Sequence, residues 1–196
     1  MGVEVEFVPT AWDGIIPAHI SSKFDVIISG MSITSQRNLT VAFSDPYVYA
    51  GQTLLANTAK TEGFTQEDYN NPDVIFAVRR ATTAALAVET TFPNATMLQF
   101  DEESAVTKEV LNGNAHALMT SEPVPSEAVR RYPDVVSIPF EESFMSTGAA
   151  FAFRKGDPDA ENFFNNWIAV NTRSGWLQER HDYWFTGDEW HDMVAE

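Results

Sequence analysis

One arginine in this chain stands close behind a loop of small and hydroxyl-bearing residues. The loop is Ser29-Gly30-Met31-Ser32, and Arg37 follows it. A guanidinium offers a carboxylate two parallel charge-assisted hydrogen bonds, and backbone N–H groups after a strand can complete an anion site. The pattern therefore predicts a carboxylate-binding site. The alternative is a surface arginine at the start of a helix.

A tryptophan and a pair of threonines are further candidates for contact with a small molecule. Trp12 stands between a predicted strand and a predicted helix, where its ring can pack on the apolar part of a ligand or on a cation. Packing in a core is the alternative, and it is the more common one. Thr82 and Thr83 stand at a strand-to-helix junction, where a hydroxyl caps the helix or contributes to an anion site.

The composition excludes several classes of function. The 196 residues include 28 acidic and 12 basic side chains, so the formal net charge is −16. Such a chain repels nucleic-acid phosphates and anionic membranes. A solvated acidic surface is the simplest interpretation of this charge, and attraction of a cationic ligand or partner is the alternative.

Cofactor chemistry finds no support in the residue types. The chain has no cysteine, which excludes disulfides and thiolate metal sites. The histidines show no metal-ligand spacing, and no glycine-rich nucleotide fingerprint occurs. We therefore expect no metal and no cofactor. The opening MGVEVEFVPT also lacks the basic and apolar regions of a signal peptide.

Two successions of strand and helix are predicted to position the candidate residues. The first consists of a strand at 3–9, a short helix within 12–24 and a buried strand at 24–33. A strand at 47–57 leads into the second succession, and a further strand begins at residue 146. The other predicted strands are 73–80, 95–100, 116–122 and 134–140, and the predicted helices are 82–92, 102–113, one ending near 131, 158–173 and 174–185.

This order predicts two α/β lobes joined by two strands, near residues 50–56 and 146–153. A lobe that the chain enters and leaves through adjacent strands is typical of a hinged architecture. We expect residues 1–54 and 147–196 to form the first lobe and residues 55–146 to form the second.

Residues 8–55 resemble the first lobe of the polar amino-acid-binding proteins of ABC importers, the bacterial solute-binding family 3. The segments that carry the resemblance are AWDGIIP, DVIISGMSIT with the following Arg37, FSDPY and GQTLL. Residues 90–123 resemble the second lobe of that family. RKGDPD and SGWLQERHDYWF resemble its return to the first lobe. The resemblance implies a type II periplasmic-binding-protein fold, a small-molecule ligand, an ABC permease as partner and a periplasmic location.

The resemblance also assigns roles to individual residues. Trp12 would cover the ligand side chain, Arg37 would bind the ligand carboxylate, and the threonine pair would clamp that carboxylate when the lobes close. The full set of predicted ligand-binding residues is Trp12, Ser29, Gly30, Ser32, Arg37, Thr82, Thr83 and Ser121.

Two residues depart from the family pattern. Ser121 stands where the family usually has an aspartate that binds the α-ammonium group, and a hydroxyl cannot neutralise that charge. Ala81 replaces the usual glycine of the second-lobe loop. Carboxylate binding is therefore expected to be retained, whereas the ammonium site is altered.

The family's first strand and helix, which precede residues 3–9 in the resemblance, have no counterpart in this sequence. We expect the first lobe to be incomplete. It would be either weakened or completed by another chain, which would make an oligomer.

Two other functions are alternatives to ligand binding for import. Some relatives of this fold are dehydratases of cyclic carboxylates, and such chemistry needs a general acid in the cleft. Turnover of arogenate or prephenate would identify an enzyme of this kind. A sensory ligand-binding module is the third alternative.

Overall fold

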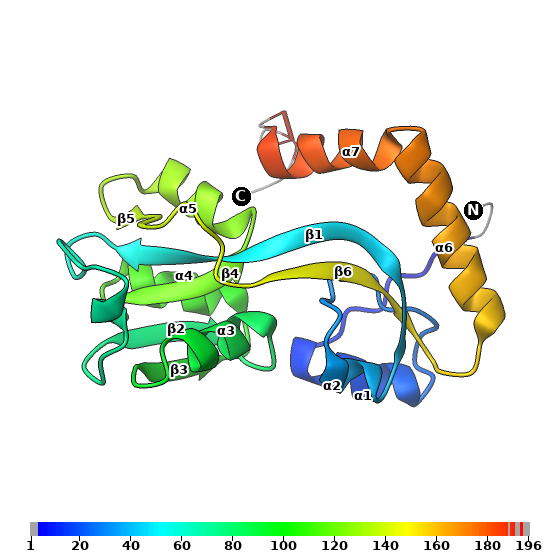
Figure 1. Cartoon of the computed structure of the whole chain (residues 1–196), viewed down its shortest axis with the longest axis horizontal. Helices are drawn as coiled ribbons and strands as arrows, with labels where there is room; N and C mark the ends of the chain where they lie inside the picture. The colour runs from blue at the N-terminus through cyan, green and yellow to red at the C-terminus, as the bar shows by residue number, and fades with distance from the viewer. Residues whose placement is uncertain (1–3, 188, 191–192, 194–196) are drawn as a thin grey trace.

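The structure, a computed structural model, describes residues 4–187, 189–190 and 193 and shows two lobes joined by two long strands (Figure 1). The joining strands are β1 (Ala42–Asn57) and β6 (Ser146–Phe153), which lie side by side and antiparallel. The two-lobe α/β fold expected from the sequence is therefore confirmed. Within the described residues, no helix has the length and apolar character that would let it cross a bilayer.

The first lobe is built mainly from helical segments packed on the joining strands. These are η1 (Trp12–Gly14), α1 (Ile15–Ile20), α2 (Ser35–Asn38), α6 (Pro158–Arg173), α7 (Trp176–His181) and the π-helical turn η3 (Asp182–Thr186). The second lobe contains η2 (Glu67–Tyr69), β2 (Ile75–Arg79), α3 (Thr83–Thr91), β3 (Thr96–Phe100), α4 (Glu103–Leu111), β4 (Ala117–Ser121), α5 (Val124–Arg131) and β5 (Val136–Ser137).

The sheet of the second lobe places three strand ends at one edge. Its strand order is β3-β2-β4-β1-β5. Strand β2 runs parallel to both β3 and β4, so the carboxyl ends of all three strands point the same way. Open α/β sheets bind ligands at this kind of edge. In this protein the edge faces the first lobe.

Alternate side chains of these strands build two separate cores. One face packs against α3, and the other face packs against α4 and α5. Phe76 and Val78 of β2 face α3, whereas Ala77 between them faces α4. Both faces are covered, which explains why β2 is an almost continuous apolar run.

The first lobe has a smaller core around the paired strands. It gathers Ile15, Ile27, Met31, Val41 and Ala152, all of which are buried. On the other side, α6 packs on the joining strands through aromatic contacts, such as that of Trp167 with Phe151. The core of the first lobe is therefore formed by the two joining strands and by the helical segments that pack on them.

Strand β1 is continuous through both lobes, and its partner changes at one point. Gly51 is its last residue paired with β6, opposite Ser146, and Gln52 is its first residue paired with β4, opposite Ser121. We propose the lobe division at 54/55 and 146/147 because the chain changes its sheet partner beside these positions.

Two predicted strands of the first lobe are wrong. Residues 4–9 form no strand and are exposed, and residue 3 lies outside the described residues. Residues 24–33 make only two isolated bridges, Ile27 with Ala152 and Ser32 with Ala149. Residues 24–33 lie along β6, where Ile27 and Ala152 exchange backbone hydrogen bonds, but the pairing is not continuous. An alternating or β-branched sequence forms a regular strand only where a neighbouring strand pairs with it along its length.

The other predicted elements are confirmed with shifted ends. The strand predicted at 134–140 shortens to the two residues of β5, whereas β1 begins five residues before its predicted start at 47. Gly113, expected to end a helix, has a φ of 72° just after α4. Asp157 caps α6 by accepting a hydrogen bond from the Ala160 N–H at 2.9 Å.

Candidate functional site

A cavity of about 140 Å³ lies between the two lobes, at the edge where β2 and β4 end. It contains seven of the eight residues that the sequence predicts to bind a ligand. Hydroxyl groups and backbone from both lobes form most of its wall. The lining residues are Trp12, Ser29, Gly30, Ser32, Gln52, Arg79, Thr82, Thr83, Ala84, Glu103, Thr120 and Ser121.

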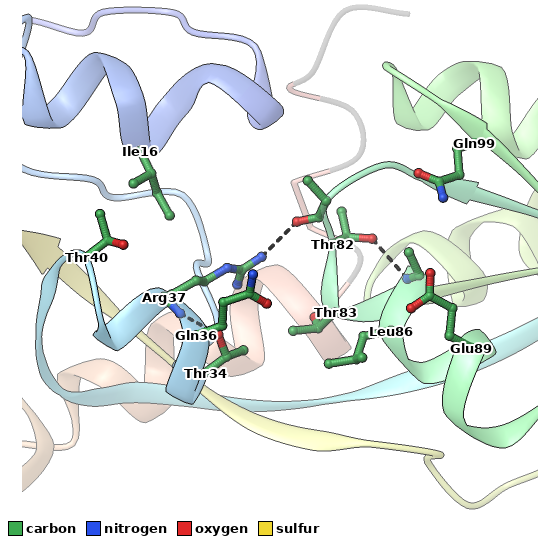
Figure 2. A pocket seen from close by; sticks show the side chains of 12 residues that line it. Ile16, Thr34, Gln36, Arg37, Thr40, Thr82, Thr83, Leu86, Glu89 and Gln99 are labelled. Atoms are coloured by element: carbon green, nitrogen blue, oxygen red, sulfur yellow. Dashed lines mark hydrogen bonds between the residues drawn. The ribbon is translucent and has the colours of Figure 1, made fainter.

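The eighth predicted residue, Arg37, lines a neighbouring cavity of about 410 Å³, which also reaches Thr82 and Thr83. Figure 2 shows its side chain extending from α2 toward the loop that precedes α3. The structure therefore places all eight predicted residues at the interface between the lobes. Their binding of a ligand remains a prediction.

Arg37 uses both ends of its guanidinium on backbone carbonyls. Nη1 donates to the Ser32 carbonyl at 2.9 Å, within the first lobe, and Nη2 donates to the Ala81 carbonyl at 3.0 Å, across the cleft. Thr34 caps α2 by accepting from the Arg37 N–H, which fixes where the side chain starts. Burial lowers the pKa of Arg37, yet a guanidinium stays protonated at neutral pH.

Trp12 meets the same carbonyl from the first lobe. Its Nε1–H donates to the Ala81 carbonyl at 3.0 Å. The guanidinium carbons of Arg37 and Arg79 lie 5.4 and 5.7 Å from its ring centroid, within the range of cation–π contacts. Trp12 is thus a partly buried residue that packs against the first-lobe core and also lines the cleft, with its N–H group used by the Ala81 carbonyl.

Ala81 adopts a conformation that is unusual for a residue with a side chain. Its φ is 57°, in the left-handed region that glycine occupies at much lower cost. This backbone turn presents one carbonyl to both Arg37 and Trp12. Ala81, which replaces the glycine usual in the family, therefore lies at a strained point that connects the two lobes.

The two threonines have different tasks. The Thr82 hydroxyl caps α3, since it accepts from the Ala85 N–H at 3.2 Å and donates to the Arg79 carbonyl at 2.6 Å. The Thr83 hydroxyl lies 3.4 Å from the Ser32 hydroxyl.

Thr83 also accepts a hydrogen bond from Nε2 of Gln52, at 3.3 Å. The Thr82 hydroxyl is therefore used to cap α3. The hydrogen bonds of the Thr83 hydroxyl are longer, so this hydroxyl is better suited to exchange its partners for a ligand.

Gly30 also has a specific backbone role. Its φ of 64° lies in the left-handed region, and its N–H donates to the Tyr47 hydroxyl at 3.0 Å. Burial raises the pKa of Tyr47, so this hydroxyl stays neutral and able to donate onward. The loop conformation predicted from the small residues therefore depends on Tyr47, which the sequence interpretation did not include.

The sequence interpretation missed two charged residues of the cavity, Arg79 and Glu103. Glu103 begins α4, three residues after the end of β3, and its Oε1 atom is buried without a hydrogen-bond partner in the described part of the chain. Burial raises the pKa of its carboxyl, although the Thr120 hydroxyl and the charge of Arg79 act in the opposite direction. Its position after a parallel strand is the signal that could have identified it.

The described residues contain no group of three or more acidic or histidine side chains arranged to hold a metal ion. The small cavity instead combines Arg79, the Trp12 ring, several hydroxyls and the Glu103 carboxyl, and Arg37 lines the neighbouring cavity. That set can hold a small polar molecule through charge and hydrogen bonds, with contributions from both lobes.

These features define a two-lobed α/β protein with a polar cavity between its lobes. The chain belongs to the bacterial extracellular solute-binding proteins, family 3, whose family model matches residues 1–187. This result confirms the family that the sequence motifs indicate.

Three relatives illustrate the range of this similarity. The cyclohexadienyl dehydratase of Pseudomonas aeruginosa is 23% identical over 185 residues, which cover 94% of this chain and 69% of the relative. The crystal structure of the ancestral amino acid-binding protein AncCDT-1, a precursor of cyclohexadienyl dehydratase, is 39% identical, with a TM-score of 0.82 over 94% of this chain and 78% of that one.

The third is a putative binding component of an ABC transporter from Wolinella succinogenes, solved in complex with lysine. It is 32% identical, and its TM-score is 0.88 over 97% of this chain and 82% of that one.

Proposed function

We propose that this protein is the solute-binding component of an ABC importer and that it binds an amino acid or a related small carboxylate between its lobes. The observation that carries the proposal is the cleft position of Arg37, whose fork already makes two hydrogen bonds and spans both lobes. The lysine complex of the Wolinella succinogenes relative supports an amino acid as ligand.

The contacts of Arg37 suggest how ligand binding and closure are linked. A ligand carboxylate offers a charged acceptor, which forms a stronger hydrogen bond with the guanidinium than the neutral Ala81 carbonyl does. Trp12 then covers the bound molecule, and the Thr83 hydroxyl engages it from the second lobe. The ligand favours the closed state only through the contacts that it gains there.

The partner and the location follow from the same proposal. The closed form would present both lobes to a membrane permease, which would receive the ligand. The protein would act in the periplasm. Co-purification of the closed, ligand-bound form with its permease tests this part of the proposal.

The first prediction concerns Arg37. Replacement by alanine should abolish amino-acid binding in calorimetry, because a carboxylate would lose a bidentate charge-assisted contact worth about 1.5–3 kcal/mol per hydrogen bond. Lysine at this position should recover only part of the affinity, since it cannot form the fork.

Arg173→Ala is the matched control, because Arg173 is exposed in the last turn of α6 and lies outside the cleft. An Arg37→Ala protein with unchanged affinity would remove Arg37 from the ligand site.

A dehydratase on the same scaffold is the second candidate. The observation that favours it is Glu103, a cleft carboxyl whose raised pKa suits a general acid. Incubation with arogenate and prephenate, followed by absorbance, tests this candidate. Turnover that Glu103→Gln abolishes would establish it, and an absence of turnover would leave ligand binding as the function.

A further inference from the structure

The α-ammonium group of an amino acid needs a negatively charged partner when the lobes close around it. The resemblance places Ser121 at the position that usually supplies this partner, and Ser121 offers only a hydroxyl. A buried ammonium without a carboxylate would lose its solvation without a charge to replace it. The altered position therefore raises the question of which residue of this chain could serve instead.

Among the residues that the structure describes, Glu103 is the one carboxylate that lines the small cavity, and Ser121 lines the same cavity. The two residues approach from neighbouring elements, because Glu103 begins α4 and Ser121 ends β4. Both follow or end strands whose carboxyl ends share one edge of the sheet. A carboxylate can thus reach the site from the end of β3 rather than from the end of β4.

One oxygen of the Glu103 carboxyl is available to a ligand. Its Oε1 atom is buried and has no hydrogen-bond partner among the described residues. In the described part of the chain, Arg79 is the one cation that lines the same cavity. Its Nε donates to the Asp101 carbonyl at 3.0 Å, and its guanidinium lies over the Trp12 ring. A buried carboxylate oxygen without a partner is costly to the folded state, which is typical of a functional group.

We propose that Glu103 receives the α-ammonium group of an amino acid whose carboxylate Arg37 binds. This inference rests on the proposed function and makes it more specific, because the ligand must then be a zwitterion. Arg37 belongs to the first lobe and Glu103 to the second. A ligand with both charges would therefore connect the lobes electrostatically, whereas a simple carboxylate would engage Arg37 alone.

The test compares two sets of probes, whose paired members differ in a single group. The first probes are the twenty proteinogenic L-amino acids, tested by thermal shift and then by calorimetry. The second probe is the 2-hydroxy acid analogue of each amino acid that binds, in which a hydroxyl replaces the ammonium. Wild-type protein should prefer the amino acid, and Glu103→Gln should reduce that affinity by about 10- to 100-fold.

The same variant should leave the affinity for the 2-hydroxy acid unchanged, because no charge is then lost. Adding Ser121→Asp to Glu103→Gln should restore amino-acid binding by returning a carboxylate to the cavity. Glu102→Gln is the matched control, since Glu102 precedes α4 but is exposed and does not line the cavity. It should bind like the wild type.

Three outcomes would overturn the inference. Equal losses for both probes in Glu103→Gln would show that Glu103 only supports the structure. Wild-type binding of 2-hydroxy acids but of no amino acid would preserve the proposed function and refute the ammonium site. Wild-type protein that binds neither class would refute the proposed function and the inference together.

Discussion

At the scale of single residues, the Ala81 carbonyl is where the two lobes meet. It accepts hydrogen bonds from Trp12 and Arg37, and Ala81 holds a left-handed φ to present it. A residue with a side chain costs roughly 1–2 kcal/mol more than glycine in this region. The chain thus keeps a strained residue at the point where the cleft closes.

The strain at Ala81 leads to a prediction about stability. Ala81→Gly should stabilise the protein by about 0.5 kcal/mol or more, because relief of strain exceeds the added unfolded-state entropy of roughly 0.4–1 kcal/mol. Chemical denaturation measures the difference. Ala105→Gly, within helix α4, is the opposite control and should destabilise by roughly 0.5–1 kcal/mol. Destabilisation by Ala81→Gly would refute the strain.

Some residues of the site could be predicted from the sequence, and others could not. Trp12, Arg37 and the threonines stand in motifs with recognisable spacing, so their place at the cleft could be predicted. The contact of Arg37 with Ala81 joins residues far apart in the chain and depends on how the lobes close. Glu103 could be found only by combining three predicted strands into one parallel edge, which needs the strand order.

At the scale of elements, helix α3 links the fold of the second lobe to its site. Thr82 caps this helix, and Thr83 in its first turn faces the first lobe. The start of α3 therefore positions the hydroxyl that we propose to engage the ligand.

Loss of the cap should weaken this arrangement measurably. Thr82→Ala should destabilise the protein by about 1 kcal/mol, because one N–H at the start of α3 loses its acceptor. Thr82→Ser keeps the hydroxyl and should retain most of the stability in urea denaturation. A serine variant as unstable as the alanine variant would contradict a capping role and indicate a role for the methyl group.

The same scale explains where sequence patterns succeeded and where they did not. Strands β2 and β4 were predictable because each has a neighbouring strand on both sides, and the edge strand β3 pairs along its whole length with β2. Residues 4–9 and 24–33 have comparable patterns, but in the described part of the chain residues 4–9 form no strand and residues 24–33 meet β6 only at two isolated bridges. A periodic sequence gives a preference for extended structure, and the neighbouring strands decide whether a strand forms.

At the scale of the whole molecule, charge is the dominant feature. The net charge of −16 makes the folded chain repel itself, and mobile ions screen this repulsion with a Debye length of about 10 Å at 0.1 M salt. The compact state should therefore gain stability from salt.

This expectation has a simple measurement. Raising sodium chloride from low to about 0.5 M should increase stability by on the order of 1 kcal/mol, which corresponds to roughly 2–4 °C in Tm. Potassium chloride at equal concentration should act equally, since screening depends on ionic strength. A Tm that stays constant or falls with salt would show that self-repulsion does not limit stability.

The two hydrogen bonds that the Ala81 carbonyl accepts also affect how tightly a ligand must bind. Trp12 and Arg37 bridge the cleft by donating to the Ala81 carbonyl, so these contacts between the lobes use protein groups alone. A ligand gains only the difference between its own contacts and the bridge that it displaces. A carboxylate that binds Arg37 weakly would then fail to compete with the Ala81 carbonyl, and the bridge would set a lower limit to the affinity of the ligand that we propose.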